Sequence, residues 1–183
     1  NILTLSETER LIRQNIPPAA KPFKDAQEVL DYKKALDGFL YSDTPISEEN
    51  IMEFHSKAMN WLALGAGEFR VQNVKIRGNP DFKTPDWKEL GSLLKRFFEY
   101  AEKPLPKKVH AAQLVEAAAF LHNEFQRIHP FIDGNSRTSR AIFTKTLIQH
   151  GFSLIKIPVG FSDQYMGLTK LSPKRDDKKF ALL

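Results

Sequence analysis

Helical periodicity is the feature of this sequence that most restricts its possible folds. The longest apolar pattern, over residues 109–128, repeats Leu114, Ala117, Leu121 and Phe125 at spacings of three and four residues. Such spacing places apolar side chains on one face of an α-helix. Similar patterns predict further helices over about 5–16, 25–41, 48–59, 87–102, 136–150 and 163–170. The sequence therefore predicts a mainly α fold.

Local capping signals predict where several of these helices begin and end. Thr4 and Glu7 have the spacing of a capping box, and Ser47 precedes another apolar helical pattern. Thr84 is predicted to cap a helix that opens with Pro85. Gly151 has the position of a glycine that closes a helix.

One segment departs from the helical pattern. Gly65, Gly67, Gly78, Pro80 and Pro85 interrupt the chain, and apolar and polar residues alternate over 69–76 between them. This combination predicts a short strand or hairpin.

Length and composition indicate one globular domain. The chain has 183 residues, of which 42% are hydrophobic and 27% are charged. The absence of cysteine excludes a disulfide scaffold, a thiolate zinc site and a cysteine nucleophile, and it fits a reducing compartment, so we expect a cytoplasmic location. No run of about 18 apolar residues predicts a membrane span. We expect N-terminal helices over 1–41, a core over 42–171 and a solvated, charged tail over 172–183.

Residues 129–140 concentrate groups that can handle phosphate. A loop rich in Pro and Gly separates two predicted helices, and the second begins near Asn135. The N-terminus of a helix offers unsatisfied N–H groups and a positive dipole end to an anion. Arg137 and Arg140 are three residues apart and therefore share a face of this helix. Two guanidinium groups beside a helix N-terminus suit a polyphosphate.

Two further side chains of the loop suggest group transfer. A carboxylate at Asp133 would repel phosphate unless it held Mg²⁺, which favours carboxylate and phosphate oxygens. His129 has a side chain that can take a proton from an attacking hydroxyl. Each feature also has an ordinary structural explanation, as a packed histidine, a common turn sequence or surface arginines, so these residues alone leave both possibilities open.

Residues 129–140 closely resemble the signature loop of the Fic (Fido) family, His-Pro-Phe-x-Asp/Glu-Gly-Asn-Gly-Arg-x-x-Arg. Eight defined positions match in order, and Ser136 stands where glycine is usual. Gly67-Glu68-Phe69-Arg70, followed by the predicted strand, resembles the family's flap, and the likeness covers nearly the whole chain. The resemblance implies a Fic-type helical bundle with a short β-hairpin flap over about 67–79.

Members of this family usually transfer AMP from ATP to a Ser, Thr or Tyr hydroxyl of a target protein. By this resemblance His129 is the general base, Asp133 binds Mg²⁺ and Phe131 anchors the loop in the core. The residues implied in nucleotide and phosphate binding are Gly134, Asn135, Ser136, Arg137, Arg140 and Tyr165. The residues implied in main-chain pairing with an extended target segment are Gln72, Asn73, Val74, Lys75 and Ile76.

Ser136 has two possible consequences. In a helical conformation serine costs little and keeps its N–H, whereas a positive φ would strain it. We expect reduced or altered activity rather than none.

The first residues, 1–7, resemble the segment that follows an inhibitory helix in self-inhibited members of the family. That resemblance implies a glutamate, outside this chain, that pairs with Arg140. Self-modification and a homodimer stay open.

Other functions remain as alternatives. The same loop could remove AMP or transfer another phosphate group, or it could belong to an inactive binding module. The net charge of +5 suggests nucleic-acid binding as one alternative. The basic residues are spread along the chain, however, so we expect neither nucleic acid nor membrane as a partner. His122 and His129 could share a helical face in a metal-dependent hydrolase, although no third ligand stands out.

Overall fold

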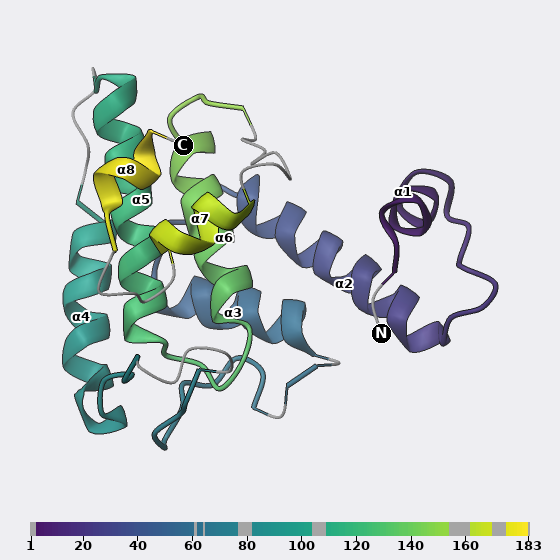
Figure 1. The fold of residues 1–183 in the computed structure, drawn as a ribbon, viewed down its shortest axis with the longest axis horizontal. Helices are drawn as coiled ribbons and strands as arrows, with labels where there is room; N and C mark the ends of the chain where they lie inside the picture. Colours follow the sequence, from purple (N-terminus) through teal and green to yellow (C-terminus); the bar gives the residue numbers. More distant parts are fainter. Residues whose placement is uncertain are drawn as a thin grey trace.

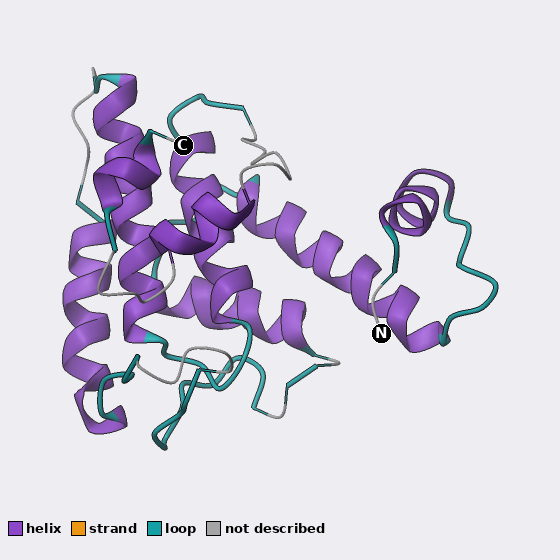
Figure 2. Ribbon diagram, viewed as in Figure 1, coloured by secondary structure: helices purple, strands orange, loops and turns teal. Residues whose placement is uncertain are grey.

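The computed structural model describes residues 3–60, 62–63, 65–76, 82–103, 109–153, 162–169 and 175–182. It confirms the expectation of a mainly helical fold, and no strand is drawn in the described parts of the chain (Figures 1 and 2). The helices are α1 (Leu5–Gln14), α2 (Phe23–Leu40), α3 (Glu48–Met59), the 3-10 helix η1 (Trp87–Glu89), α4 (Leu90–Ala101), α5 (Ala111–Ile128), α6 (Asn135–Ile148), α7 (Ser162–Thr169) and α8 (Asp177–Ala181).

Of the three predicted helix N-caps, two are confirmed and one is wrong. The Glu7 N–H donates to Thr4 Oγ1 over 3.2 Å, and the Thr4 N–H donates to Glu7 Oε2 over 2.7 Å, which completes a capping box at α1. The Ser47 hydroxyl likewise caps α3. Thr84 caps no helix, because its hydroxyl donates to the Val74 carbonyl over 2.8 Å and Asp86 caps η1 instead.

Helices α5 and α6 lie side by side, and the loop over 129–134 joins their ends (Figure 1). Apolar side chains from α2 to α6 form the main core around this pair, and its fully buried members include Ile51, Phe125, Ile128, Phe131 and Ile142. Removing such side chains from water is the main source of folding free energy. The loop is therefore fixed between two buried helices.

Helix α2 extends beyond this core, and α1 lies against its far end (Figure 1). Leu11 of α1 is 2% exposed and packs in a small second cluster with Leu3 and Ala26. The structure thus places α1 well away from the loop over 129–134.

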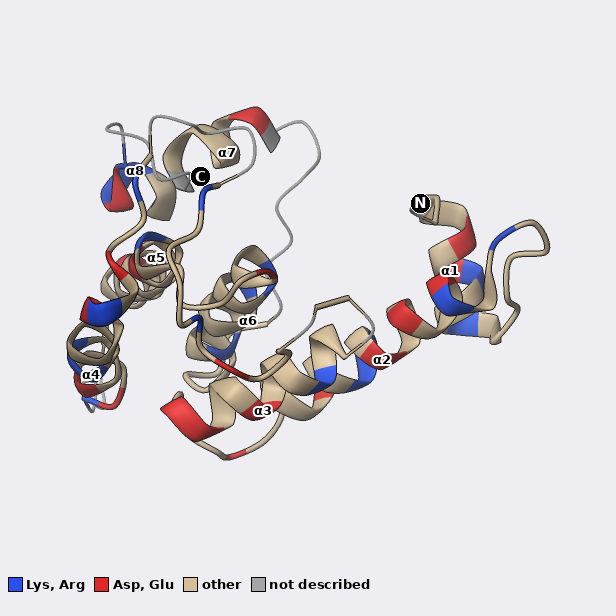
Figure 3. Ribbon diagram, turned by 90° about the horizontal axis from the view of Figure 1, so that it is seen from below, with Lys and Arg blue, Asp and Glu red and all other residues tan. Residues whose placement is uncertain are grey.

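The charged tail folds back onto α5. Arg175 Nη1 lies 2.7 Å from Glu124 Oε2, and Arg175 Nη2 lies 2.8 Å from Asp177 Oδ2. Phe180 is 5% exposed and packs with Ala119 and Tyr165. The described residues 175–182 therefore combine exposed lysines at 178 and 179 with an apolar anchor at Phe180. Both acidic and basic positions lie along α1, α2 and α4 (Figure 3).

The described part of the predicted flap contains one antiparallel bridge, between Lys75 and Lys83. Residues 77–81, which include Gly78 and Pro80, lie outside the described residues, as does the apolar segment 155–159. The bridge holds the two arms of the segment together, and the hairpin stays a prediction. Among the described helices, none is long and apolar enough to cross a membrane.

Candidate active site

The loop between α5 and α6 begins and ends with left-handed backbone. His129 has φ 51° and caps the C-terminus of α5, and Gly134 has φ 80° at the N-cap of α6. A left-handed conformation is costly for a residue with a Cβ atom and easy for glycine. His129 therefore occupies a backbone conformation that the surrounding contacts must hold in place.

Asn135 closes the loop with its side chain. Its Oδ1 accepts the Phe131 N–H over 3.0 Å, and its Nδ2 donates to the Phe131 carbonyl over 2.9 Å. Asn135 is 2% exposed, so this pair of hydrogen bonds is shielded from water. The side chain thus fixes the loop, and only the main-chain N–H of Asn135 is left for a ligand.

His55 of α3 contacts the same loop through ring stacking and a hydrogen bond. Its ring stacks on Phe131 with centroids 3.6 Å apart, which confirms Phe131 as a core anchor. The Gly67 N–H donates to His55 Nδ1 over 2.9 Å, so Nδ1 carries no proton and Nε2–H donates to the Asp133 carbonyl over 2.9 Å. Burial lowers the pKa of His55, which keeps this neutral tautomer.

Arg70 joins the loop to the predicted flap. Its Nε donates to the His129 carbonyl over 2.8 Å, its Nη1 to the Gln72 carbonyl over 2.9 Å and its Nη2 to the Pro85 carbonyl over 2.7 Å. The Arg70 main-chain N–H also donates to the Pro130 carbonyl over 2.8 Å. Arg70 is 2% exposed, and its planar fork explains why an arginine suits this position.

His129 has the tautomer that a general base needs. Its Nδ1 lies 3.3 Å from the Gln126 carbonyl, which can only accept, so Nδ1 carries the proton and Nε2 keeps a lone pair to which no described residue donates. Burial lowers the pKa of His129 to about 4, and the nearby Arg70 charge acts in the same direction. The ring is therefore neutral and able to accept a proton at neutral pH.

The first turn of α6 lacks a capping side chain. Gly134 is the N-cap and makes no side-chain hydrogen bond to the turn, so the N–H groups of residues 135–137 have no cap. Their dipoles point out of the helix end and favour an anion. The resemblance implied that the Gly134 N–H binds phosphate. In the structure this N–H donates to Asp133 Oδ1 over 2.6 Å instead.

Ser136 lies in the first turn of α6, and it is not among the described residues with positive φ. The strain that serine would suffer at a glycine-like φ is therefore excluded. Gln126 Nε2 donates to its hydroxyl over 2.9 Å. The backbone conformation of Ser136 therefore gives no reason for the loop to be inactive.

The two arginines lie close to one ring on α2. Arg137 has its Cζ 5.9 Å from the Tyr32 ring centroid, its Nη2 3.6 Å from Glu28 Oε1 and its Nη1 3.5 Å from Met59 Sδ. Burial raises the pKa of Tyr32, while Arg140 and Arg137 both lower it, so both cations act on the same ring. Arg140 is exposed, and the pair presents positive charge beside the first turn of α6.

Tyr165 has a different position from the loop residues. It is 8% exposed, its hydroxyl lies 3.1 Å from His122 Nε2, and its ring packs with Phe180. His122 Nδ1 in turn pairs with Asn123 Oδ1 over 2.9 Å, and burial lowers the pKa of His122 to about 4. Tyr165 is therefore buried against α8 and His122. Both ring nitrogens of His122 are engaged, so neither has a lone pair left to bind a metal ion.

Asp133 is exposed at the rim of the loop. Among the described residues, no group of three or more His, Cys, Asp or Glu side chains could hold a metal by itself. Mg²⁺ commonly binds through one or two carboxylates, water and substrate phosphates. A single exposed carboxylate beside an anion-binding helix end fits that mode of binding.

The structure adds four residues to those expected from the sequence: His55, Arg70, Gln126 and Glu28. They come from different helices and loops and meet the signature loop only in the fold. His55 and Gln126 had one available signal, which is a polar side chain at a buried position of an apolar helical pattern. Glu28 had no signal in the sequence.

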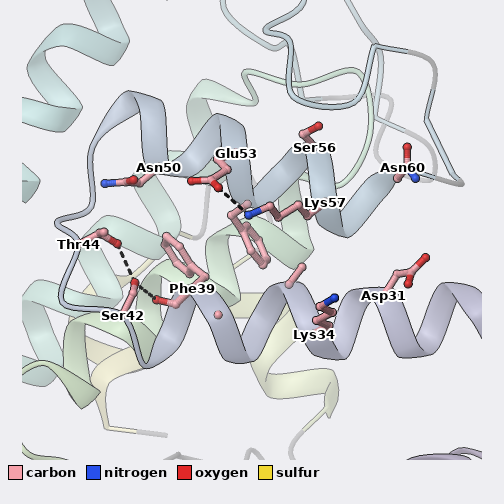
Figure 4. Close-up of a pocket in the computed structure, with 13 residues that line it drawn as sticks. Asp31, Lys34, Phe39, Ser42, Thr44, Asn50, Glu53, Ser56, Lys57 and Asn60 are labelled. Atoms are coloured by element: carbon pink, nitrogen blue, oxygen red, sulfur yellow. Dashed lines mark hydrogen bonds and ion pairs between the residues drawn. The ribbon is translucent and has the colours of Figure 1, made fainter.

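A separate open hollow of about 780 Å³ lies between α2 and α3 (Figure 4). Its lining includes Lys34, Phe39, Glu53 and Lys57, and Figure 4 shows Glu53 and Lys57 paired along α3. None of the residues expected in catalysis or nucleotide binding lines it. The hollow is therefore not the site that the sequence predicts.

Comparison with known proteins agrees with this geometry. The model of the Fic/DOC family matches residues 45–147, which is more than half of the chain and includes the whole loop. A protein adenylyltransferase Fic from Drosophila willistoni is 27% identical over 98% of the chain. The chain spans about a third (36%) of that relative's length.

Solved structures show the same fold. Fic-1 from C. elegans superposes with a TM-score of 0.79 at 22% identity, over 100% of this chain and 54% of that one. The BepC protein from Bartonella tribocorum, with bound AMPPNP, superposes with a TM-score of 0.67 at 15% identity, over 92% of this chain and 88% of that one.

Proposed function

The chain belongs to the Fic/DOC family, and we propose that it transfers AMP from ATP to a Ser, Thr or Tyr hydroxyl of a target protein. The observation that carries this proposal is the His129 ring, which is neutral and has a free Nε2 beside the uncapped first turn of α6. The curated relatives named protein adenylyltransferase Fic support the same reaction class.

In the proposed reaction His129 Nε2 takes the proton of the target hydroxyl. The hydroxyl oxygen bonds to the α-phosphorus of ATP, the bond to the β-phosphate oxygen breaks, and pyrophosphate leaves. A general base contributes about 10²–10⁴-fold to such a step. The left-handed backbone at His129 and the Arg70 bond to its carbonyl hold the ring in position for this transfer.

We propose that the phosphates bind the first turn of α6. The N–H groups of Asn135 and Ser136 and the guanidinium groups of Arg137 and Arg140 supply the positive field. Gly134 joins them once a ligand displaces the Asp133 carboxylate from its N–H. Mg²⁺ would be held by Asp133 and would neutralise phosphate charge when bound.

We propose that the segment Gln72, Asn73, Val74, Lys75 and Ile76 binds the target protein through main-chain hydrogen bonds. Its support is the Lys75–Lys83 bridge and the Arg70 bond to the Gln72 carbonyl, which tie this segment to the loop that carries His129. Main-chain pairing gives affinity while side-chain pockets give specificity. A short β-hairpin over about 67–79 is part of this proposal.

The remaining expectations from the sequence also stay proposals. Tyr165 is proposed to act near the adenine through its position on α7, and Arg140 is proposed to pair with an inhibitory glutamate. A homodimer is likewise proposed on the sequence alone. Self-modification, a cytoplasmic location and the division into 1–41, 42–171 and 172–183 rest on the sequence alone.

Replacing His129 tests the proposal directly. The chain is incubated with ATP, Mg²⁺ and a cell lysate, and mass spectrometry records AMP on Ser, Thr or Tyr. We expect His129→Ala to abolish this mass gain while ATP binding, measured by calorimetry, stays within about twofold. His110→Ala is the matched control, because His110 is exposed at the opposite end of α5. Equal AMP transfer by the His129→Ala variant would overturn the proposal.

A further inference from the structure

Gln126 and Ser136 meet across the two ends of the loop. Gln126 lies in the last turn of α5 and Ser136 in the first turn of α6, and Gln126 Nε2 donates to Ser136 Oγ over 2.9 Å. We propose that Gln126 orients the Ser136 hydroxyl as an additional donor to a phosphate oxygen of the nucleotide, which makes Ser136 a specificity residue for polyphosphate. This inference rests on the function proposed above.

The direction of the hydroxyl proton follows from its partner. A serine hydroxyl has one hydrogen and two lone pairs, and the Gln126 amide occupies one lone pair. The hydrogen must therefore point to another acceptor. The neighbouring N–H groups of the first turn of α6 are donors and cannot accept it.

The nearby main-chain carbonyls of the described residues do not supply that acceptor. A helical serine often bonds a carbonyl three or four residues earlier. For Ser136 those carbonyls belong to Asp133 and Ile132, and the Ser136 hydroxyl donates to neither of them; the Asp133 carbonyl accepts the His55 Nε2–H over 2.9 Å. Ser136 lies in the first turn of α6 and is exposed, so a phosphate oxygen can reach its hydroxyl.

Gln126 is also placed to hold the base and the phosphate site in a fixed relation. Its main-chain carbonyl lies 3.3 Å from His129 Nδ1, while its side chain holds Ser136. Gln126 is 7% exposed, and the hydrogen bond from its buried amide to Ser136 favours one orientation of that side chain. Gln126 is thus a positioning residue, and Ser136 is the group that would touch the ligand.

Calorimetry with ATP and Mg²⁺, and separately with adenosine, tests this assignment. Ser136→Ala and Ser136→Gly should weaken ATP binding about tenfold, because a hydrogen bond to a charged acceptor is lost. Ser136→Thr keeps the hydroxyl and should bind ATP within about twofold of wild type. Adenosine has no phosphate, so its affinity should not change in any of the three variants.

Gln126→Met tests the role of Gln126, because methionine has a similar length and no hydrogen-bond donor. It should weaken ATP binding by about threefold to tenfold, and Gln126→Met with Ser136→Ala should bind no more weakly than Ser136→Ala alone. If the losses of ATP affinity in the two single variants add up in the double variant, Gln126 does not act through Ser136.

Two outcomes separate this inference from the function on which it rests. If wild type binds ATP and both Ser136→Ala and Ser136→Gly bind it equally well, or if adenosine binding falls in parallel, the inference is wrong and the proposed function stands. If wild type binds no ATP, the proposed function fails, and the inference fails with it.

Discussion

Arg70 Nε donates to the carbonyl oxygen of His129 over 2.8 Å, and this bond links two residues that are 59 positions apart. The same guanidinium binds the Gln72 and Pro85 carbonyls. One buried side chain therefore holds the proposed base and the proposed target-binding segment in a single arrangement. The relation between these two parts of the site depends on Arg70 more than on any local sequence signal.

Replacing Arg70 should affect both stability and transfer. Lysine keeps the charge but has no planar fork, so Arg70→Lys loses at least two of the three side-chain hydrogen bonds. We expect the free energy of unfolding to fall by about 2 kcal/mol and kcat for AMP transfer to fall about tenfold or more. Urea denaturation and a transfer assay measure the two effects. Arg96→Lys, at an exposed position of α4, should change neither; an unchanged kcat in Arg70→Lys would contradict the positioning role.

Gly134 is predicted to tolerate no side chain. At φ 80° an added Cβ would lie 2.8 Å from His55 Nε2 and 2.9 Å from Met59 Sδ. We expect Gly134→Ala to lower the free energy of unfolding by about 3 kcal/mol and to abolish transfer, because the loop must move. Gly91→Ala in α4 meets nothing within 4 Å and should stabilise the protein by about 0.5 kcal/mol. Similar melting temperatures for the two variants would refute this account of the loop.

The pH profile of transfer reports the state of His129. Its pKa of about 4 in the folded protein means that Nε2 is unprotonated above about pH 5. Because only the neutral ring can accept a proton, kcat/KM should be flat from pH 8 to pH 5 and should fall below that range. A histidine at its ordinary pKa of 6.5 would already lose most of its activity by pH 5.5. A decline centred near pH 6.5 would therefore contradict the burial argument.

Glu28 is expected to oppose nucleotide binding. Its Oε1 lies 3.6 Å from Arg137 Nη2, so it partly neutralises a charge that would otherwise face phosphate. Glu28→Gln should tighten ATP binding about twofold to fivefold at low salt, and the gain should shrink at high salt because the pair is partly exposed. Calorimetry at two ionic strengths measures this. Glu53→Gln is the control, since Glu53 pairs with Lys57 on the exposed side of α3; weaker ATP binding in Glu28→Gln would show that Glu28 positions Arg137 instead.

Much of the fold could be predicted because its signals are local. The capping box at Thr4 and the apolar spacing over 109–128 depend on neighbouring residues, and both appear in the structure. The helix cap predicted at Thr84 was wrong because its hydroxyl donates to the Val74 carbonyl, in a distant segment. The packing of Phe180 against α5 could not be predicted, because no charge pattern indicates this contact.

In the candidate site, too, the local part could be predicted and the contacts from distant segments could not. The residues of 129–140 are contiguous, so spacing alone brought the proposed base, carboxylate and arginines together. Their supports are His55, Arg70, Gln126 and Glu28, which reach the loop from α2, α3, α5 and the segment after α3. Such contacts depend on how the helices pack, so they could not be read from the sequence.

The source of the transferred phosphorus tests the central claim most directly. The chain is incubated with a cell lysate, Mg²⁺ and ATP that is labelled either at the α-phosphate or at the γ-phosphate, and labelled protein is counted after the free nucleotide is removed. Transfer of AMP predicts label on protein from the α position and none from the γ position, with both signals absent in His129→Ala. Label retained only from the γ position would contradict AMP transfer and would make the reaction a phosphate transfer.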